Sequence, residues 1–300
     1  MTRESVWQER ALGCPFRRGA DTIPRDKRDL RLSSSVRSMD EGSHKNLSLF
    51  PAGQWPPDDL TPQQCSPELR RHVLTLVPYF QALSPAELEE VHAAFAARHM
   101  LATDTLVAAG DPAETLYVIV SGRVKLVKGG PDGSELMVDV LGPGDYFGAL
   151  PLLGQATNEQ RAEAITGGCV LVTTTEAFGA LVTRFPSVAV AVLEDVSGRL
   201  RSAHERLHEA AAPVEARLAS TLLTLSARFG VDSDEGRTLG APLSQEDLAA
   251  LAGTTLETVN RVLATWRKRG WVTTGRLKLL INAPAELEKL SGRRHTDQSP

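Results

Sequence analysis

The chain lacks long apolar runs and clustered cysteines. In its 300 residues, no apolar run reaches the ~18 residues that a membrane span needs. The N-terminus has no apolar core like that of a signal peptide. The three cysteines, Cys14, Cys65 and Cys169, are odd in number and far apart, which argues against a disulfide framework. These absences predict a cytoplasmic protein in a reducing compartment, with no membrane partner.

The chain also lacks the side-chain sets on which catalysis and metal binding depend. It has no Cys-X-X-Cys pair, which excludes a zinc ribbon and an obvious iron–sulfur cradle. We find no nucleophile–base set, no metal-ligand cluster and no phosphate-binding P-loop. Too few residues remain outside the segments discussed below for a catalytic domain. A nucleotide-regulated enzyme is therefore only a remote alternative.

Residues 1–66 differ in composition from the rest of a chain whose length suits two domains. They mix Arg, Asp and Ser, and then become Pro-rich with little apolar periodicity, which predicts a disordered tail. Ten basic residues lie before Asn46, so weak contact with DNA or another polyanion is the alternative to a solvated tail. Met39 is a candidate for an alternative start.

The most informative stretch is residues 243–281. Ser244 suits the N-cap of a short helix, with an acidic residue three positions further on. Gly253 allows the tight turn that side chains with a Cβ resist. Either Thr254 or Thr255 then caps a second helix.

The second helix carries one apolar face, and a strand pair follows it. Its apolar residues recur at helical spacing: Val259, Val262, Leu263 and Trp266. Residues 272–281 fit two short strands that turn at Gly275. This order of elements predicts a winged helix-turn-helix, a unit that binds DNA. The alternative is an ordinary helical hairpin with a solvated charged end.

Side chains suited to DNA contact fall on the exposed positions of this unit. They are Thr255, Leu256, Glu257, Asn260, Arg261, Arg267, Lys268 and Arg276. Arg261 suits guanine and Glu257 suits cytosine, unless Glu257 only forms a capping box with Thr254. Residues 254–281 hold six basic and one acidic side chain, a local charge of +5 in a chain of net charge −4. Such a basic patch is typical of a DNA-binding protein.

From Leu101 the hydrophobic period changes to two, and turn residues separate short segments. The segments are TLVAAG, TLYVIVSG, VKLVKG, ELMVDVLG, YFGAL, RAEAIT and CVLVTTT. Strands this short indicate a compact antiparallel barrel or roll. Before them, we predict a short amphipathic helix within residues 68–80 and a second helix over residues 85–100.

A long helix is predicted from about Ser187 to Ala212. Its apolar residues are spaced alternately three and four residues apart: Leu193, Val196, Leu200, Ala203 and Leu207. This heptad seam implies a partner helix and hence a homodimer, unless the face packs on the roll of its own chain. Pro213 interrupts the pattern and suits a hinge.

A roll, a long helix and a winged helix-turn-helix in this order resemble the Crp/Fnr family of bacterial transcription regulators. The segments that carry the resemblance are GDPAETLYVIVSGRVKLV, LGPGDYFGALPLL, NEQRAEAIT and LSQEDLAALAGTTLETVNRVL. The resemblance covers about residues 67–290 and implies an α+β fold. Its three parts are a cyclic-nucleotide-binding-type β-roll (a jelly roll) over 67–186, a dimerisation helix over 187–212 and a winged helix-turn-helix over 213–290. Composition adds the disordered tail over 1–66 and a flexible tail over 291–300.

The resemblance also implies an effector site in the roll. In members that bind cAMP, a phosphate cassette, here residues 148–161, and part of the long helix hold the nucleotide. The positions concerned are Gly148, Ala149, Leu150, Arg161, Ala162, Ser202, Ala203 and His204. Gly148 and Arg161 match the family pattern. Ala149 replaces the expected ribose-binding Glu, Ala162 replaces a common Ser or Thr, and the Thr-Ser pair that meets adenine is absent.

These departures leave the effector open. Ala149 cannot accept the ribose hydrogen bond, and a buried unpaired hydroxyl costs about 1–3 kcal/mol. Arg161 is able to hold an anion, or else it pairs with Glu159 or Glu163. The alternatives are cAMP, another small anionic effector, and no effector, with the roll serving only as a dimer scaffold.

Other effectors of the family find less support. The iron–sulfur members need a clustered N-terminal cysteine set, which Cys14 and Cys65 do not form. His204 is a candidate haem ligand, but a lone His on a dimer helix is more typical of packing or hydrogen bonding. Cys169 lies in an apolar strand, which favours an inert core thiol over a redox switch.

The resemblance sharpens the DNA prediction. Glu257 and Arg261 match the E-x-x-x-R reading pair, and Leu256 stands where cAMP-responsive members often carry Arg. An apolar side chain there suits a thymine methyl group. We predict a palindromic site with a G·C pair near the centre of each half, the half-sites lying about one helical turn apart. The predicted function is a homodimeric, sequence-specific transcription regulator, with RNA polymerase as a further partner implied by the family.

Overall fold

The computed structural model describes most of the chain beyond the predicted N-terminal tail. The described residues are 65–130, 133, 135–148, 154–234 and 236–292. They belong to the second of two compact units, residues 45–300. The predicted tails, residues 1–66 and 291–300, lie almost wholly outside this description, so their character stays a prediction.

Three short helical elements precede the sheets: α1 (Pro67–Leu74), η2 (Pro78–Phe80) and α2 (Pro85–Ala93). Their starts follow from local chemistry, since Ser66 caps α1 and Ser84 forms a capping box with Glu87 at the start of α2. The prediction that this second helix continues to residue 100 is wrong. Residues Ala96–Met100 form strand β1, because they pair with strand β8.

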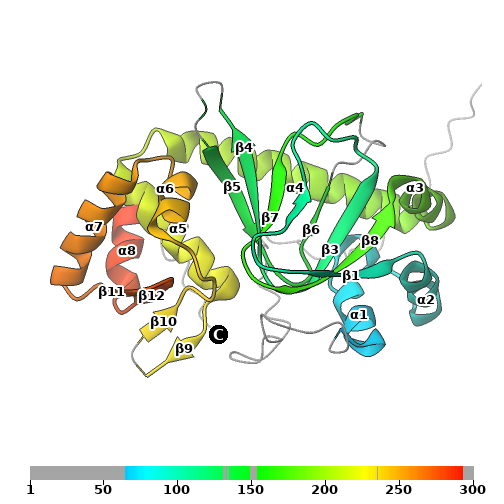
Figure 1. Cartoon of the computed structure of the whole chain (residues 1–300), viewed down its shortest axis with the longest axis horizontal. Coiled ribbons are helices and arrows are strands. Elements are labelled where there is room, and N and C mark those ends of the chain that lie inside the picture. Colours follow the sequence, from blue (N-terminus) through cyan, green and yellow to red (C-terminus); the bar gives the residue numbers. More distant parts are fainter. Residues whose placement is uncertain (1–64, 131–132, 134, 149–153, 235, 293–300) are drawn as a thin grey trace, which may run out of the picture. The chain divides into compact units, whose positions relative to one another are not determined.

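The predicted roll is confirmed as two four-stranded antiparallel sheets (Figure 1). One has the order β1-β8-β3-β6, and the other has the order β2-β7-β4-β5. The strands are β2 (Thr105–Val107), β3 (Thr115–Ser121), β4 (Val124–Gly129), β5 (Glu135–Leu141), β6 (Tyr146–Phe147), β7 (Arg161–Ala164) and β8 (Gly168–Thr174). Buried side chains from both sheets, such as Ile119 and Val124, share one core cluster.

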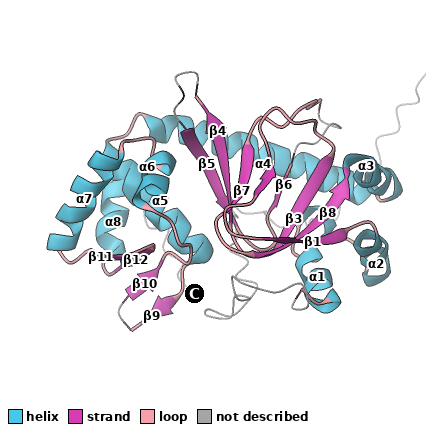
Figure 2. Ribbon diagram, viewed as in Figure 1, coloured by secondary structure: helices cyan, strands magenta, loops and turns pink. Residues whose placement is uncertain are grey.

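Helices α3 (Thr175–Arg184) and α4 (Pro186–Ala210) follow the roll (Figure 2). Helix α4 is the predicted long helix, and it ends two residues earlier than expected. It buries Val188 and Val192 in the core that α1, η2 and β8 share. Among the described residues, no single helix is long and apolar enough to cross a membrane. One sharply bent pair, α3 with the first part of α4, passes that test by length and composition only.

The C-terminal part has four helices and a four-stranded sheet. The helices are α5 (Val214–Phe229), α6 (Gln245–Leu251), α7 (Leu256–Lys268) and α8 (Pro284–Ser291). The sheet has the order β11-β12-β10-β9, from β9 (Asp232–Ser233), β10 (Gly236–Thr238), β11 (Val272–Gly275) and β12 (Lys278–Ile281). Residues 230–242 are rich in Gly, Asp and other turn formers, a composition typical of a loop. Strand β10 forms there because Arg237 and Thr238 pair with β12.

A disulfide joins Cys65 to Cys169, so the expectation of separate thiols is wrong. The two residues are 104 positions apart, which is why their spacing gave no sign of pairing. Their Cα atoms are 6.3 Å apart, within the usual range for a disulfide. Both are buried, Cys169 within strand β8 and Cys65 just before the N-cap of α1.

Candidate nucleic-acid interface

Helix α6 and the turn after it are built as the sequence predicts. The Ser244 hydroxyl accepts from the Asp247 N–H at 3.0 Å, and the Asp247 carboxylate accepts from the Ser244 N–H at 2.9 Å. This capping box satisfies N–H groups that have no partner within the helix. Gly253 has φ +60°, the left-handed conformation that glycine adopts without strain. The turn at Gly253 therefore leads directly into the start of α7.

Helix α7 is capped by Thr255, whose hydroxyl accepts from the Thr258 N–H at 3.3 Å. The cap is therefore not Thr254, and the alternative of a Thr254–Glu257 capping box is wrong. Glu257 is exposed, and it has no hydrogen-bond or ion-pair partner among the described residues. Its carboxylate is available to a ligand.

The two faces of α7 differ as a recognition helix requires. The four predicted apolar residues, Val259, Val262, Leu263 and Trp266, are all buried and share a core with α5. The opposite face carries Leu256, Glu257, Asn260 and Arg261, all exposed. Positions 256 and 260, 257 and 260, and 257 and 261 are three or four residues apart, so they share a helix face. These side chains form one continuous surface on α7.

The remaining predicted DNA-contacting residues flank that surface. Arg267 and Lys268 end α7, where cations complement the helix dipole. Arg276 lies in the turn between β11 and β12, together with Leu277, whose φ is +54°. The wing therefore turns just after the predicted Gly275. Thr255, Arg267, Lys268 and Arg276 are all exposed.

The cations of this unit are not neutralised by its own carboxylates. They are Arg261, Arg267, Lys268, Arg269, Arg276 and Lys278. Within the described ranges, none of them forms an ion pair with another residue. The Arg267 guanidinium donates to the Thr274 hydroxyl at 3.3 Å, and that of Arg269 lies 4.8 Å from the Trp271 ring centroid. The positive charge of this patch is therefore available to attract a polyanion.

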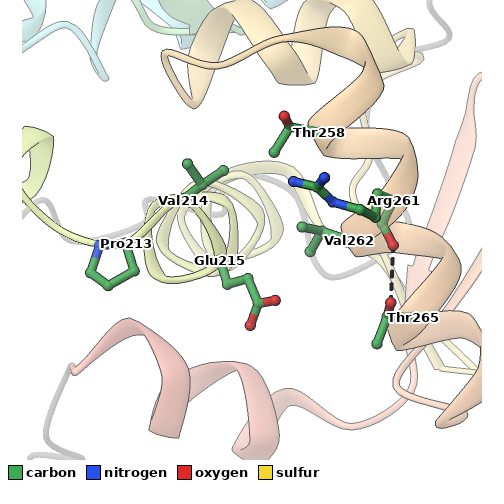
Figure 3. Close-up of a pocket in the computed structure, with 7 residues that line it drawn as sticks. All are labelled: Pro213, Val214, Glu215, Thr258, Arg261, Val262 and Thr265. Carbon is green, nitrogen blue, oxygen red and sulfur yellow. Dashed lines mark hydrogen bonds between the residues drawn. The ribbon is translucent and has the colours of Figure 1, made fainter.

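An open hollow of about 430 Å³ adjoins Arg261, between the start of α5 and α7 (Figure 3). Its lining residues are Pro213, Val214, Glu215, Thr258, Arg261, Val262 and Thr265. The Arg261 side chain extends from α7 into this hollow, while its carbonyl accepts from the Thr265 hydroxyl at 3.0 Å. The guanidinium therefore has room to turn towards a ligand.

Arg161, the predicted anion-binding residue of the roll, is already paired. Its guanidinium lies 3.0 Å from the Glu135 carboxylate and 3.4 Å from that of Glu163. Of the two partners weighed from sequence, Glu163 is therefore present, whereas Glu159 pairs with Lys128 at 2.9 Å. Two carboxylates around one guanidinium oppose the approach of an anion.

The other residues expected at the effector site have different positions. Gly148 is required sterically, because it has φ +108° and a Cβ there would lie 2.3 Å from the Thr115 carbonyl oxygen. Ala162 is buried within the roll. Ser202 and Ala203 are half-buried on α4, and His204 there is exposed. Ala149 and Leu150 lie outside the described residues. In the part of the chain described, no group of three or more His, Cys, Asp or Glu side chains is placed to hold a metal ion.

Sequence reasoning missed a polar cluster that ties α4 to the roll. The Asp195 carboxylate of α4 accepts from the hydroxyls of Tyr79 and Tyr146 and from the Arg199 guanidinium. Burial, with the negative charge of Asp195, raises the pKa of Tyr79 and of Tyr146 well above the usual value. No local pattern signals this cluster, because Asp195 lies 49 and 116 residues from the two tyrosines.

A second missed group surrounds Arg228 of α5. Its guanidinium lies 2.6 Å from the Asp139 carboxylate and 2.8 Å from that of Asp145. Burial acts to lower the pKa of Arg228, but the two carboxylates outweigh it and raise the pKa. Two neighbouring residues before Gly148 therefore contact different helices. Asp145 pairs with Arg228 of α5, and Tyr146 donates a hydrogen bond to Asp195 of α4.

Two family models match the chain. A cyclic nucleotide-binding domain matches residues 97–185, and a Crp-like helix-turn-helix domain matches residues 216–290. A cyclic AMP receptor protein from Thermus thermophilus is 32% identical over 218 residues, covering 71% of this chain and 96% of that protein. The chain belongs to the Crp/Fnr family. A CRP-like cAMP-activated global transcriptional regulator from Mycobacterium tuberculosis is 31% identical over 186 residues, covering 62% of this chain and 83% of that protein.

Two solved structures agree with the fold. FixK2 from Bradyrhizobium japonicum aligns with a TM-score of 0.59 at 23% identity, covering 65% of this chain and 96% of that chain. A CRP-family transcriptional regulator from Thermus thermophilus aligns with a TM-score of 0.56 at 27% identity, with the same two coverages. As a Crp/Fnr protein, the chain is a DNA-binding transcription regulator with a cyclic nucleotide-binding domain. Its relatives are regulators rather than enzymes.

Proposed function

We propose that this chain is a homodimeric regulator of the cytoplasm that binds a palindromic site in double-stranded DNA. The observation that carries the proposal is the surface of α7, where Glu257, Asn260 and Arg261 are exposed above a buried apolar face. Arg is able to grip guanine with two hydrogen bonds, and Glu accepts from cytosine. The cations around this surface that have no ion-pair partner are suited to contact the DNA phosphates on both sides of a groove.

The dimer is proposed from an uncovered seam on α4. Leu193 and Leu200 are 62% and 58% exposed, and Val196 is 36% exposed. The roll of the same chain therefore does not cover this face; it buries Val188 and Val192 instead. Apolar residues repeating at heptad spacing suit a second copy of the same helix. Ala203 lies further along the same helix, and Leu207 is assigned to this seam by its spacing alone.

Fluorescence anisotropy on a palindromic duplex with a G·C pair in each half tests the DNA proposal. We expect this duplex to bind at least about tenfold tighter than one in which A·T replaces both pairs, since each mismatch typically costs about 1–3 kcal/mol. Equal affinity for both duplexes would contradict base reading by Arg261 and Glu257. Sedimentation of the wild type and of Leu193→Asp tests the dimer. We expect the wild type to sediment as a dimer and the variant as a monomer, because the substitution buries a charge in the proposed interface.

The roll has two candidate roles. The Mycobacterium relative is described as cAMP-activated, and Gly148 and Arg161 match the cassette of such proteins. In that case a cyclic nucleotide, or another small anion, binds one arrangement of α4 and the following helices more tightly than the other. Binding then shifts the protein towards that arrangement. The Glu135 and Glu163 carboxylates on Arg161, and an Ala at position 149, favour the second role, a dimer scaffold without an effector.

Adding cAMP to the anisotropy experiment separates the two roles. Unchanged affinity, with tight binding in its absence, supports the scaffold. Tightening by cAMP supports the sensor despite Ala149. A pull-down with RNA polymerase on the promoter-bound dimer tests the remaining partner that family membership suggests.

A further inference from the structure

We propose that Cys65 and Cys169 are a redox-reversible thiol pair whose oxidation strengthens DNA binding by fixing α4 on the roll. A transcription regulator meets DNA in the reducing interior of the cell, where disulfides are rare and, when present, usually transient and redox-sensing. A disulfide inside the roll of such a protein therefore points to a response to oxidants.

The surroundings of the two cysteines suit both redox states. Both side chains belong to one buried apolar cluster, which also includes Val73, Tyr79 and Val188. A free cysteine behaves there as a small hydrophobic residue, so the reduced pair also fits the core. The two S–H groups formed on reduction are only weak hydrogen-bond donors.

The backbone holds the two cysteines to different degrees, although both are buried. Cys169 is fixed within β8, which pairs with β1 and β3 on its two sides, and its N–H donates to the Ser121 hydroxyl at 3.0 Å. Cys65 lies outside the sheets, just before the N-cap Ser66 of α1, and its carbonyl accepts from the Arg70 guanidinium at 2.8 Å. In this proposal, local opening at the start of α1 is the route by which an oxidant reaches Cys65.

The chemistry is thiol–disulfide exchange with a low-molecular-weight disulfide such as oxidised glutathione. The Cys65 thiolate attacks the oxidant, forms a mixed disulfide and releases one reduced thiol. The Cys169 thiolate then attacks the Cys65 sulfur, forms the intramolecular bond and releases the second reduced thiol. The cysteine pair loses two protons and two electrons, and the electrons reduce one disulfide to two thiols.

A short path connects this bond to α4. The bond pins the start of α1, and the chain continues from α1 directly into η2. Helix η2 packs against α4 and contributes Tyr79, whose hydroxyl donates to Asp195 of α4 at 3.3 Å. When the disulfide is reduced, α1 and η2 lose their covalent anchor to β8. The arrangement of α4, which carries the exposed apolar seam, is then less firmly held.

The first experiment detects the bond itself and does not depend on DNA. The full chain is equilibrated with excess oxidised or excess reduced glutathione, acid-quenched, unfolded and alkylated, and its peptides are analysed by mass spectrometry. We expect a Cys65–Cys169 linked peptide in the oxidised sample, and separate peptides with alkylated Cys65 and alkylated Cys169 in the reduced sample. Alkylated Cys65 and Cys169 in both samples would overturn the proposal, and so would a linked peptide in both.

The second experiment measures DNA affinity of the same two samples, and it rests on the proposed DNA-binding function. We expect reduction to weaken binding by about fivefold or more, the lower end of usual coupling between sites. Cys65→Ser should remove this dependence, and Cys14→Ser should keep it. Equal affinity of the two wild-type samples overturns the proposal, and this comparison needs no variant to fold. Absence of DNA binding in both samples counts instead against the proposed function, while the alkylation result still stands.

Discussion

Arg261 of helix α7 differs from Arg161 of the roll and Arg199 of α4 in what its guanidinium group touches. Arg261 on α7 has no ion-pair partner among the described residues, whereas Arg161 in the roll contacts two glutamates. Arg199, on the helix that packs against the roll, is held by Asp195. A cation that its own protein leaves unpaired is available to an external anion, and a cation already flanked by carboxylates is not. We therefore expect Arg261 to bind a ligand and Arg161 and Arg199 to hold elements of the fold together, as Arg228 of α5 does with Asp139 and Asp145.

The largest effect that we expect comes from removing a carboxylate that a helix shares with the roll. Asp195→Ala leaves the buried Tyr79 and Tyr146 hydroxyls and Arg199 without this partner. Each buried polar group left unpaired costs about 1–3 kcal/mol, so we expect a loss of about 3 kcal/mol in the free energy of unfolding. Urea denaturation followed by circular dichroism measures it.

Asp232→Ala is the matched control for that variant. Asp232 also pairs with an arginine, Arg237 at 3.0 Å, but its side chain is 67% exposed. Exposed ion pairs contribute about 0–1 kcal/mol, so this variant should unfold close to wild type. If the two variants lose equal stability, burial does not distinguish the Asp195 cluster from a surface pair.

The next effect concerns DNA sequence discrimination. Arg261→Ala should weaken binding to the predicted palindrome by roughly 1–3 kcal/mol and relax the preference for G·C at one position in each half-site. The reason is that the exposed guanidinium is the group on α7 best suited to read guanine. Anisotropy on a set of duplexes with single base-pair changes measures both quantities. An equal loss on every duplex would refute the assignment of Arg261 to base reading.

Lys268→Ala should have a smaller and different effect. Lys268 ends α7, where its ammonium suits a phosphate rather than a base edge. We expect a uniform loss of affinity on all duplexes and a decrease of about 1 in the slope of log affinity against log salt concentration. A salt titration of wild type and variant measures it, and an unchanged slope would remove Lys268 from the interface.

The sequence was most informative where one helix face decides the fold. In α7, the spacing of Val259, Val262, Leu263 and Trp266 was sufficient, because all four side chains are buried as predicted. Family resemblance supplied the type of the roll, a cyclic nucleotide-binding domain. Strand β1 was mistaken for helix, since nothing within residues 96–100 shows that β8 lies beside them in the fold. Tertiary pairing there overrode a local helical pattern.

The remaining failures share a physical cause, which is long separation along the chain. The Cys65–Cys169 bond closes a separation of 104 residues, and the Tyr79–Asp195 contact one of 116. Arg161 matches a family motif in sequence, yet its charge is balanced by Glu135, 26 residues away on another strand. Periodicity and motif spacing describe neighbours along the chain, so they do not report which distant side chains meet in the folded core.

Arg161→Ala should have the smallest effect. The side chain is 35% exposed, and its partners Glu135 and Glu163 are exposed or half-buried. Such a pair contributes at most about 1 kcal/mol after solvent screening, so unfolding should change little. If the roll is a scaffold, DNA affinity with and without cAMP should also stay as in wild type. A gain in affinity on adding cAMP to wild type, lost in Arg161→Ala, would mean that the guanidinium leaves its glutamates to bind the nucleotide. The distinction between binding and cohesive arginines would then describe only the unliganded roll.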